Sequence, residues 1–300
     1  MRADANPPVA VACPGCGAPV PMPTFRLSAV CAHCDTPVVD AARARATVDA
    51  VVPFQVPRKA AAAAIAAHLR AHRLAPRRIA RLRVLDRHLE GEFMPVYAID
   101  GTVTGRYEAK IGIHYTTTTT RRGLDGKRRT VTEVKTQWFS LRGRCGRNIE
   151  DHLASGAAIL PEQVANALEP FDLGWAQAFD PRLVAGFAAY AFDTPRDQAV
   201  DVAHDEILAA EARRIARDFL PGDEKDLASL TSNLRIERVR RVLVPIWRAK
   251  VPYAGRQLVF TVNGQTGRVL GKVPVSPWKV GGIVAAVAAV LLYLWWRAGG

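Results

Sequence analysis

Two cysteine pairs near the N-terminus constrain this chain more than any other feature of its sequence. Cys13 and Cys16 are separated by two residues, and after 14 further residues Cys31 and Cys34 repeat that spacing. Two thiolates three positions apart on a tight turn can bind one metal ion from the same side, and a second pair completes the tetrahedron. The pattern therefore predicts that these four cysteines hold one structural Zn²⁺ in a zinc ribbon over residues 8–40.

The same four positions limit the chemistry of the predicted site. A redox-active C-x-x-C pair normally belongs to a βαβ segment, and no such pattern surrounds these cysteines. Four protein ligands leave no coordination position for water or substrate, so we expect the ion to be structural rather than catalytic. His33 lies between two ligands and is expected to face solvent, while Cys145 stands alone as an ordinary thiol.

The opposite end of the chain contains a long uncharged segment. Val280–Trp296 comprises 17 residues without a charged side chain. As a helix this segment would be ~25 Å long at ~1.5 Å per residue, against a bilayer hydrocarbon core of ~30 Å. We expect a transmembrane anchor over residues 279–297, flanked by aromatic side chains that suit the membrane interface. The alternative is a terminal helix buried inside a soluble protein.

Charge is distributed unevenly along the chain. The net charge is +13, with basic blocks at 58–145 and 233–300 and an acidic block at 146–232. Such an excess favours an anionic partner, either nucleic acid or a phospholipid surface. More basic residues precede the uncharged segment than follow it, and the N-terminus shows no apolar signal segment. The positive-inside rule then predicts a single-pass, tail-anchored protein of the cell membrane with its main body in the cytoplasm.

Between the cysteines and the uncharged segment, the residue patterns predict an α+β body. Apolar side chains at helical spacing indicate helices over Ala60–His72 and Gln198–Leu220. Runs rich in threonine and valine at Thr116–Thr120 and Thr130–Leu141 indicate a long hairpin with a basic tip. Two turns are expected at Asp100-Gly101 and Asn263-Gly264, and further strands over Leu82–Leu89, Leu234–Val242 and Val244–Lys250.

Two stretches of the body align at an offset of 150 residues. Met94–Tyr97 matches Val244–Trp247, and a Gly-Arg pair follows each at the same distance. We therefore expect two repeats of a helix packed on an antiparallel sheet. The first repeat covers 51–145 with the basic hairpin, and the second covers 146–278 with the acidic helices.

These features together resemble a known protein family. The residues concerned are Cys13-Pro-Gly-Cys16-Gly17, Leu243–Trp247, Val262–Val269 with Gly271 and Pro274, and the terminal hydrophobic anchor. They look like a family of bacterial membrane-attached proteins with a zinc ribbon of the transcription-factor-IIB type. Some members carry labels such as primosomal protein N′ or superfamily II helicase. The resemblance implies a zinc-binding, membrane-associated protein, and only the four cysteines carry over as site residues.

The helicase label fails when it is compared with the residues. The stretch nearest to a phosphate-binding loop, Gly267–Val273, has three residues instead of four between its glycines and ends in valine where a hydroxyl is required. The carboxylates and histidine within Asp201–Glu206 fit the solvated face of an acidic helix, and His114 has no identifiable partner. We therefore expect that the protein is not an enzyme and has no catalytic residues.

The basic hairpin tip is the remaining candidate for a binding site. Four interpretations stay open for it: a solvated loop, contact with anionic lipid, contact with nucleic acid, or an acidic protein partner. Its basic residues are Arg121, Arg122, Lys127, Arg128 and Arg129.

The sequence thus predicts a non-enzymatic, membrane-anchored protein whose cytoplasmic zinc ribbon and α+β body act as an interaction or scaffold component for a protein partner. The alternative is a zinc-ribbon protein that binds nucleic acid and is linked to transcription or replication. Salt-dependent retention of DNA or RNA would distinguish this alternative from the first prediction.

Overall fold

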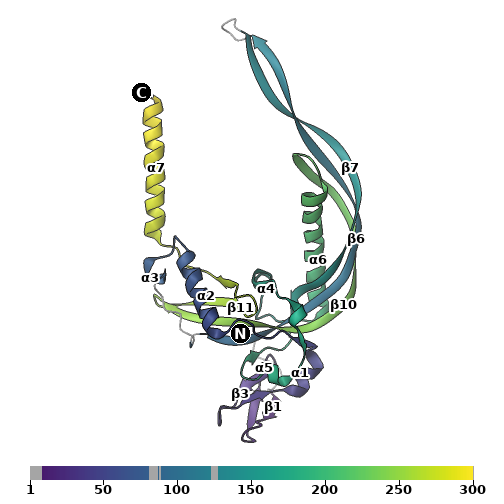
Figure 1. Cartoon of the computed structure of the whole chain (residues 1–300), viewed down its shortest axis with the longest axis vertical. Coiled ribbons are helices and arrows are strands. Elements are labelled where there is room, and N and C mark those ends of the chain that lie inside the picture. The colour runs from purple at the N-terminus through teal and green to yellow at the C-terminus, as the bar shows by residue number, and fades with distance from the viewer. Residues whose placement is uncertain (1–8, 81–86, 88, 123–127, 300) are drawn as a thin grey trace. The chain divides into compact units, whose positions relative to one another are not determined.

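A computed structural model describes residues 9–80, 87, 89–122 and 128–299. Helices and sheet are mixed (Figure 1), and the chain divides into two compact units that are each built from separate stretches of sequence. The first unit comprises Met1–Val96, Ser155–Pro195 and Arg241–Gly300, and the second comprises Tyr97–Ala154 and Arg196–Arg240. The predicted combination of helices and sheet is confirmed, and the two-repeat division stays a prediction.

Three long strands contribute residues to both units. They are β6 (Leu89–Arg122), β7 (Arg128–Ser155) and β10 (Glu224–Tyr253), and β6 pairs with both of the others. The two expected strands at Leu234–Val242 and Val244–Lys250 are therefore parts of one strand. The predicted long hairpin corresponds to β6 and β7, although its tip at 123–127 lies outside the described residues. Most of the expected strand Leu82–Leu89 also lies outside them.

The sheet of the first unit is built around the C-terminal part of β10. β11 (Arg256–Asn263) pairs with it antiparallel, and Ala254 and Gly255 join the two strands. Both joining residues have positive φ, 49° and 74°, as a two-residue type I′ turn requires. The strand order is β12 (Val269–Gly271), β11, β10, β5 (Ala50–Val51) and β8 (Gln177–Ala178), and β9 (Ala188–Ala189) pairs with β6.

Helix α2 (Arg58–Ala71) packs on this sheet and forms an apolar core of the first unit. Its alanine-rich sequence buries one face, including Ile65 and Leu69, against Trp247 and Phe260. The expected helix Ala60–His72 is confirmed. The other helices of this unit are α1 (Ala41–Thr47), α3 (Arg77–Ala80), α4 (Glu162–Leu168), α5 (Pro181–Val184) and α7 (Pro277–Gly299), with a 3₁₀ turn, η2 (Leu173–Trp175).

In the described part of the second unit, helix α6 (Arg196–Arg214) lies along the strands (Figure 1). Helix α6 continues as a π-helical turn, η3 (Ile215–Phe219), and so confirms the helix expected over Gln198–Leu220. Its buried side includes Ala203 and Ile207. The end of this helical segment and the strands share a core of Tyr107, Ala109, Ile111, Cys145, Ile215 and Leu220.

A buried carboxylate links α6 to β7. The Glu211 side chain is fully buried, and it accepts hydrogen bonds from Arg214 Nη2 at 2.6 Å and Arg147 Nε at 3.0 Å. The hydrogen bond from Arg214 lowers the pKa of Glu211, while burial acts to raise it. The hydrogen bond from Arg147 adds to the lowering, so the pKa is lowered overall. Burial and the neighbouring Glu211 raise the pKa of Cys145, and of the two positions that the sequence leaves open for this thiol, interior or surface, it takes the interior one.

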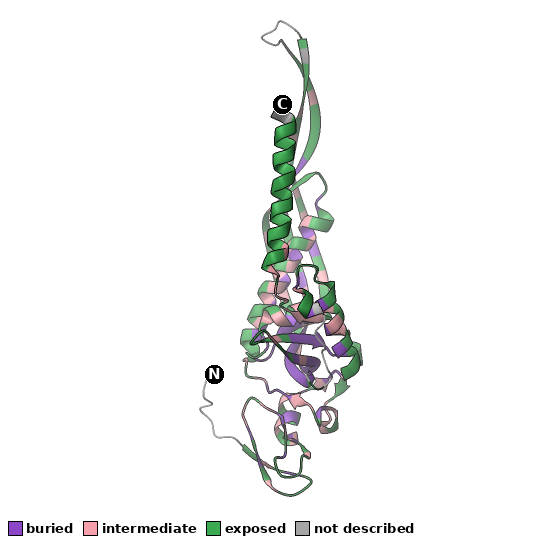
Figure 2. Cartoon of the chain, turned by 90° about the vertical axis from the view of Figure 1, so that its left-hand side faces the viewer, coloured by how far each residue is buried: buried purple, intermediate pink, exposed green. Residues whose placement is uncertain are grey.

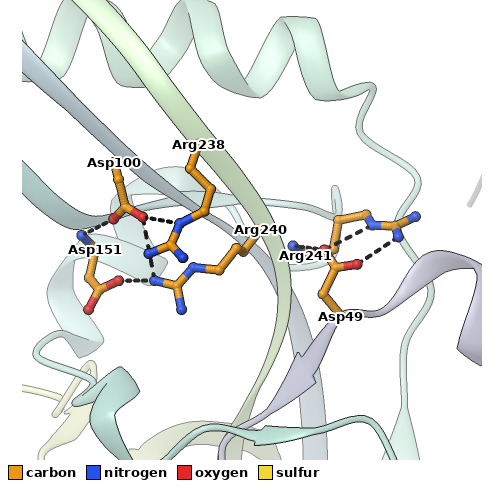
Figure 3. Close-up of polar contacts among 6 residues, drawn as sticks. All are labelled: Asp49, Asp100, Asp151, Arg238, Arg240 and Arg241. Carbon is orange, nitrogen blue, oxygen red and sulfur yellow. Dashed lines mark hydrogen bonds and ion pairs between the residues drawn. The ribbon is translucent and has the colours of Figure 1, made fainter.

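The turn expected at Asp100-Gly101 is wrong, because β6 continues through both residues. Burial alone would raise the pKa of Asp100, but hydrogen bonds from the Asp151 amide at 2.9 Å and Arg238 Nε at 2.8 Å, with the charge of Arg240, lower it (Figure 3). Gly101 faces the backbone carbonyl of Arg235 on β10 so closely that any Cβ would collide with it. The Asp-Gly pair therefore serves close strand pairing rather than chain reversal.

A second carboxylate–arginine pair on β10 belongs to the first unit. Asp49, next to β5, accepts from the backbone N–H of Arg241 at 2.7 Å and from its guanidinium at 2.8 Å (Figure 3). The pair fixes the short parallel pairing of β5 with β10 at Leu243↔Val51.

Candidate functional site

The four cysteines lie on two short hairpins of the first unit. β1 (Val9–Ala12) and β2 (Pro19–Met22) flank the first pair, and β3 (Ser28–Val30) and β4 (Pro37–Val39) flank the second. Both hairpins are antiparallel. Each cysteine pair therefore sits where a strand ends and the chain turns back, which brings both thiols of the pair to one side.

The two turns have the same hydrogen-bond pattern, displaced by 18 residues. Cys13 N–H donates to Ala18 O at 2.9 Å, and Cys31 N–H donates to Thr36 O at 3.0 Å. In each turn the residue after the second cysteine donates back to the first cysteine's carbonyl, and it has a positive φ: 75° at Gly17 and 55° at Asp35. The sequence shows this need at Gly17 only, because aspartate is a less obvious left-handed residue than glycine.

The sulfur atoms of the two turns converge. Cys13 Sγ lies 3.5 Å from Cys34 Sγ, Cys16 Sγ lies 3.7 Å from Cys31 Sγ, and all four sulfurs are within 4.8 Å of one another. A tetrahedral ion with Zn–S bonds of ~2.3 Å places neighbouring sulfurs ~3.8 Å apart. A disulfide would bring a pair to ~2.05 Å, so this cluster could hold a metal ion such as zinc and contains no disulfide.

A threonine supports the cluster from its second turn. The side chain of Thr36 lies 3.2 Å from Cys34 Sγ, and its hydroxyl and amide lower the pKa of Cys34 to about 6. The Ala18 amide lowers the pKa of Cys16, but the neighbouring thiols and burial outweigh it and raise that pKa to about 12. Adjacent sulfurs cannot all carry negative charge unless a cation lies between them, which is the condition that a divalent ion satisfies.

Gly15 makes room for this threonine. A Cβ at Gly15 would lie 2.5 Å from Thr36 Oγ1, too close for any real contact. The backbone N–H of Gly15 also donates to Cys13 Sγ at 3.4 Å. The glycine in Cys-Pro-Gly-Cys is thus required by close packing between the two turns.

The ribbon is attached to the rest of the first unit through the start of β3 and the two residues before it. Leu27 N–H donates to Ala189 O at 2.8 Å, and the Ser28 hydroxyl donates to Phe187 O at 2.6 Å while it accepts from Ala189 N–H. The Arg26 guanidinium lies 4.6 Å from the centre of the Tyr190 ring. Among the described residues, the ribbon's own core is small: Cys13, Val20, Met22, Cys31 and Val38, with Val11 and Ala29 at its margin.

Other polar residues considered in the sequence have ordinary positions. His33 is exposed, as expected. His114 does have a partner: its Nε2 lies 2.8 Å from Glu224 Oε1, which also accepts from Thr136. The sequence misses this pair because the partners are 110 residues apart. On the acidic helix, His204 lies 3.5 Å from Asp205.

The basic tip can be described only in part. Lys127 lies outside the described residues, and so do the side chains of Arg121, Arg122 and Arg129, while Arg128 is exposed. Its role as a contact for lipid, nucleic acid or protein stays a prediction.

Helix α7 is longer than the uncharged segment suggests. The part that is apolar enough to span a membrane is Pro277–Arg297, 21 residues, or ~31 Å as a helix. None of this span is buried against the body. Its start is attached to the loop after α2, because Lys279 Nζ donates to Arg73 O at 2.8 Å and Ala75 O at 2.6 Å. The helix could therefore anchor the chain in a membrane.

The Asn-Gly-Gln-Thr-Gly stretch has a structural role. The turn expected at Asn263-Gly264 is confirmed between β11 and β12, and Asn263 is fully buried. Its Oδ1 accepts from the amides of Gln265 and Thr266, and its Nδ2 donates to Leu168 O at 2.9 Å and Pro170 O at 3.0 Å. The turn thereby fixes the chain segment that follows α4.

Comparison with known proteins gives one distant relative. The chain is 23% identical over 129 residues to the Uncharacterized protein YdjG of Bacillus subtilis (strain 168). The match covers 43% of this chain and 38% of the relative, so the chain spans well under half of that protein's length. No family model and no solved structure matches the chain. The resemblance to membrane-attached zinc-ribbon proteins stays a prediction.

Proposed function

We propose that this is a non-enzymatic, membrane-anchored protein with a structural zinc ribbon and a cytoplasmic body that serves as an interaction or scaffold component. The observation that carries the proposal is the cluster of four sulfurs within 4.8 Å, provided by two matched turns. Cys13, Cys16, Cys31 and Cys34 would bind the ion, which would crosslink the two hairpins. Four thiolates complete a tetrahedral coordination, so water and substrate would find no position on it.

The membrane part of the proposal is supported by α7. Exposing a helix that is apolar on every side to water is unfavourable in free energy. In a bilayer the same side chains contact hydrocarbon, so this unfavourable free energy is removed. Trp278, Trp295 and Trp296 lie near its ends, where aromatic side chains favour the membrane interface. Lys279 and Arg297 can extend their charged ends toward the headgroups.

We also infer that the body is an internal duplication, and matched contacts in the first unit support this. Gly156 N–H donates to Pro95 O at 2.9 Å, and Gly264 N–H donates to Pro245 O at 2.8 Å. These two prolines occupy the same position in the stretches that align at an offset of 150 residues, whereas Gly156 lies beyond the predicted end of the first repeat at 145.

Each of these glycines also meets the same short motif. Phe54–Arg58 and Phe192–Arg196 share Phe-x-x-Pro-Arg and precede α2 and α6. A Cβ at Gly264 would lie 2.7 Å from the Phe54 ring, and one at Gly156 would lie 2.6 Å from the Phe192 ring. The carbonyl of each glycine accepts two amides from the motif: Gln55 and Val56 at Gly264, and Asp193 and Thr194 at Gly156.

Cell fractionation of two variants tests the membrane anchor. Val287→Asp with Leu291→Asp places two carboxylates in the centre of the span. Each raises the free energy of membrane insertion by ~2.5–3.5 kcal/mol. We expect this variant to leave the carbonate-washed membrane fraction, while the matched control Val287→Leu with Leu291→Val stays there. Full-length protein in the soluble fraction would contradict the anchor.

The alternative function, binding of nucleic acid, is favoured by one observation in the second unit. Lys110, Trp138, Phe139, Ser140 and Asp226 line an open hollow of about 410 Å³, and both aromatic side chains are exposed. Aromatic faces beside a cation suit base stacking. Retention of single-stranded DNA that falls steeply with salt, and that is lost in Trp138→Ala, would support this alternative.

A further inference from the structure

An apolar stripe on the β6–β7 hairpin of the second unit is left without cover. It consists of Ile113, Tyr115 and Phe139, whose side chains are 45%, 45% and 43% exposed. The outer part of this hairpin is coloured largely as exposed in Figure 2.

The stripe continues a buried face of the sheet. Tyr107, Ala109 and Ile111 of β6 are buried in the core beside η3, and side chains two residues apart on a strand share a face. Ile113 and Tyr115 therefore extend that face. On β7, Leu141 packs against this core. Phe139 is two residues away on the same strand and therefore lies on the same face.

The cover ends at a defined point. The chain that leaves η3 meets the backbone of β6 at Gly112, where Asp223 N–H donates to Gly112 O at 2.9 Å, and it continues as β10, which pairs with β6. Gly222 fits there with a φ of 95°, and a Cβ on it would lie 2.9 Å from Gly112 O. Beyond Gly112 the described chain places no helix over the stripe.

The hairpin itself is strongly basic, while Asp223, Glu224 and Asp226 of the neighbouring chain lie beside its inner part. Residues 110–122 and 128–142 contain seven basic side chains and a single acidic one, so the hairpin around the stripe has a net charge of +6. Basic side chains next to apolar and aromatic ones are typical of segments that lie in the interface of an anionic membrane. Tyr115 is of a type enriched at that depth.

We propose that the β6–β7 hairpin docks on an anionic phospholipid surface, with Ile113, Tyr115 and Phe139 in the boundary between headgroups and acyl chains. This rests on the proposed membrane attachment and adds a second contact to it. Lipid is favoured over nucleic acid because the aliphatic Ile113 gains from hydrocarbon but offers no ring for base stacking. Anionic headgroups pair with the basic side chains, while the stripe loses its contact with water.

The test uses the full chain in vesicles made of equal parts phosphatidylglycerol and phosphatidylcholine. Single added cysteines at Ile113, Tyr115 or Phe139 carry an environment-sensitive fluorophore, and the acyl chains carry a spin-label quencher. Thr116→Cys is the matched control, because Thr116 is adjacent to Tyr115 but on the other face of the strand. Val287→Cys reports insertion of α7, and the chain without an added cysteine gives the labelling background.

We expect quenching at Ile113, Tyr115 and Phe139 that is roughly threefold stronger than at Thr116, and its loss in vesicles of phosphatidylcholine alone. Using three stripe positions keeps the test valid when one variant fails to fold. If Val287 is quenched and the stripe positions match Thr116, the inference is overturned while the proposed anchor stands. If Val287 itself is not quenched, the membrane part of the proposed function fails. Shielding of the stripe labels by an oligothymidylate, without quenching by lipid, would overturn the inference in favour of nucleic acid.

Discussion

Thr36 influences the metal centre without being a ligand. Its hydroxyl lies 3.2 Å from Cys34 Sγ, and its hydroxyl and amide keep the pKa of Cys34 near 6. Hydrogen bonds of this kind stabilise a thiolate and orient it toward the ion. The cysteine spacing predicts the ligands, whereas this threonine gives no signal of its own in the sequence.

Replacing Thr36 with valine should weaken zinc binding. Thr36→Val keeps the shape and the amide but removes the hydroxyl, so the pKa of Cys34 should rise and zinc affinity should fall by roughly 10-fold. Competition with a chromophoric chelator at neutral pH measures the affinity. The loss should shrink as pH rises, because a higher pH restores the thiolate. An affinity equal to that of the natural chain would contradict this role.

Asn263 shows why a recognisable motif need not mark a site. All the polar atoms of its buried side chain have partners, and two of those partners are carbonyls 93 and 95 residues away. A sequence pattern indicates the turn at this position, but it cannot show which distant carbonyls the amide meets.

Asn263→Ala should therefore destabilise the first unit. The substitution leaves buried carbonyls and amides without partners. Each such group that water does not reach lowers the free energy of unfolding by ~1–3 kcal/mol. We expect a loss of about 2–4 kcal/mol in denaturant unfolding of the detergent-solubilised chain. Thr266→Ala, in the same turn, is the control and should change the free energy of unfolding by less than about 0.5 kcal/mol. Equal effects from both variants would contradict the role of the Asn263 side chain.

At the scale of elements, the local patterns predict α2, α6 and the β6–β7 hairpin because each has apolar residues at its own period. The Asp100-Gly101 turn is wrong for a physical reason: Asp100 meets Arg238 and Asp151, and Gly101 admits a neighbouring backbone. A glycine needed for close strand approach and a glycine needed for a turn look the same in a sequence.

The attachment of α6 to β7 should depend on pH through Glu211. The pKa of Glu211 is lowered from 4.5 in the folded chain. Its stabilising effect is therefore complete above the unfolded value and is lost as pH falls through the lower folded value. We expect the natural chain to lose stability on acidification below about pH 4.5, and Glu211→Gln to lose less over the same interval.

At neutral pH the Glu211 carboxylate is ionised and both of its arginine contacts are at full strength. Glu211→Gln should be less stable than the natural chain by about 2–3 kcal/mol, below the ~3–5 typical of a fully buried pair because Arg147 and Arg214 keep some exposure. Thermal unfolding of both chains across the pH range measures the difference. Parallel pH profiles for the two chains would contradict the assignment.

At the scale of the whole molecule, the sequence predicts domains in series: a ribbon over 8–40, repeats over 51–145 and 146–278, and the anchor. The compact units are instead assembled from separate segments, because β6 and β10 pair although more than 100 residues lie between them. No local pattern determines which distant strands pair. The boundaries of the ribbon, the two repeats and the anchor stay a prediction.

The central claim is that one chain combines a structural zinc centre with a membrane anchor. Metal analysis of the full-length chain, extracted from carbonate-washed membranes and purified without added metal, tests it most directly. The account predicts about one zinc per chain, and none in Cys13→Ala with Cys31→Ala, since each change removes one ligand from a different turn. A zinc content near zero in the natural chain, or one unchanged in the double variant, would contradict it.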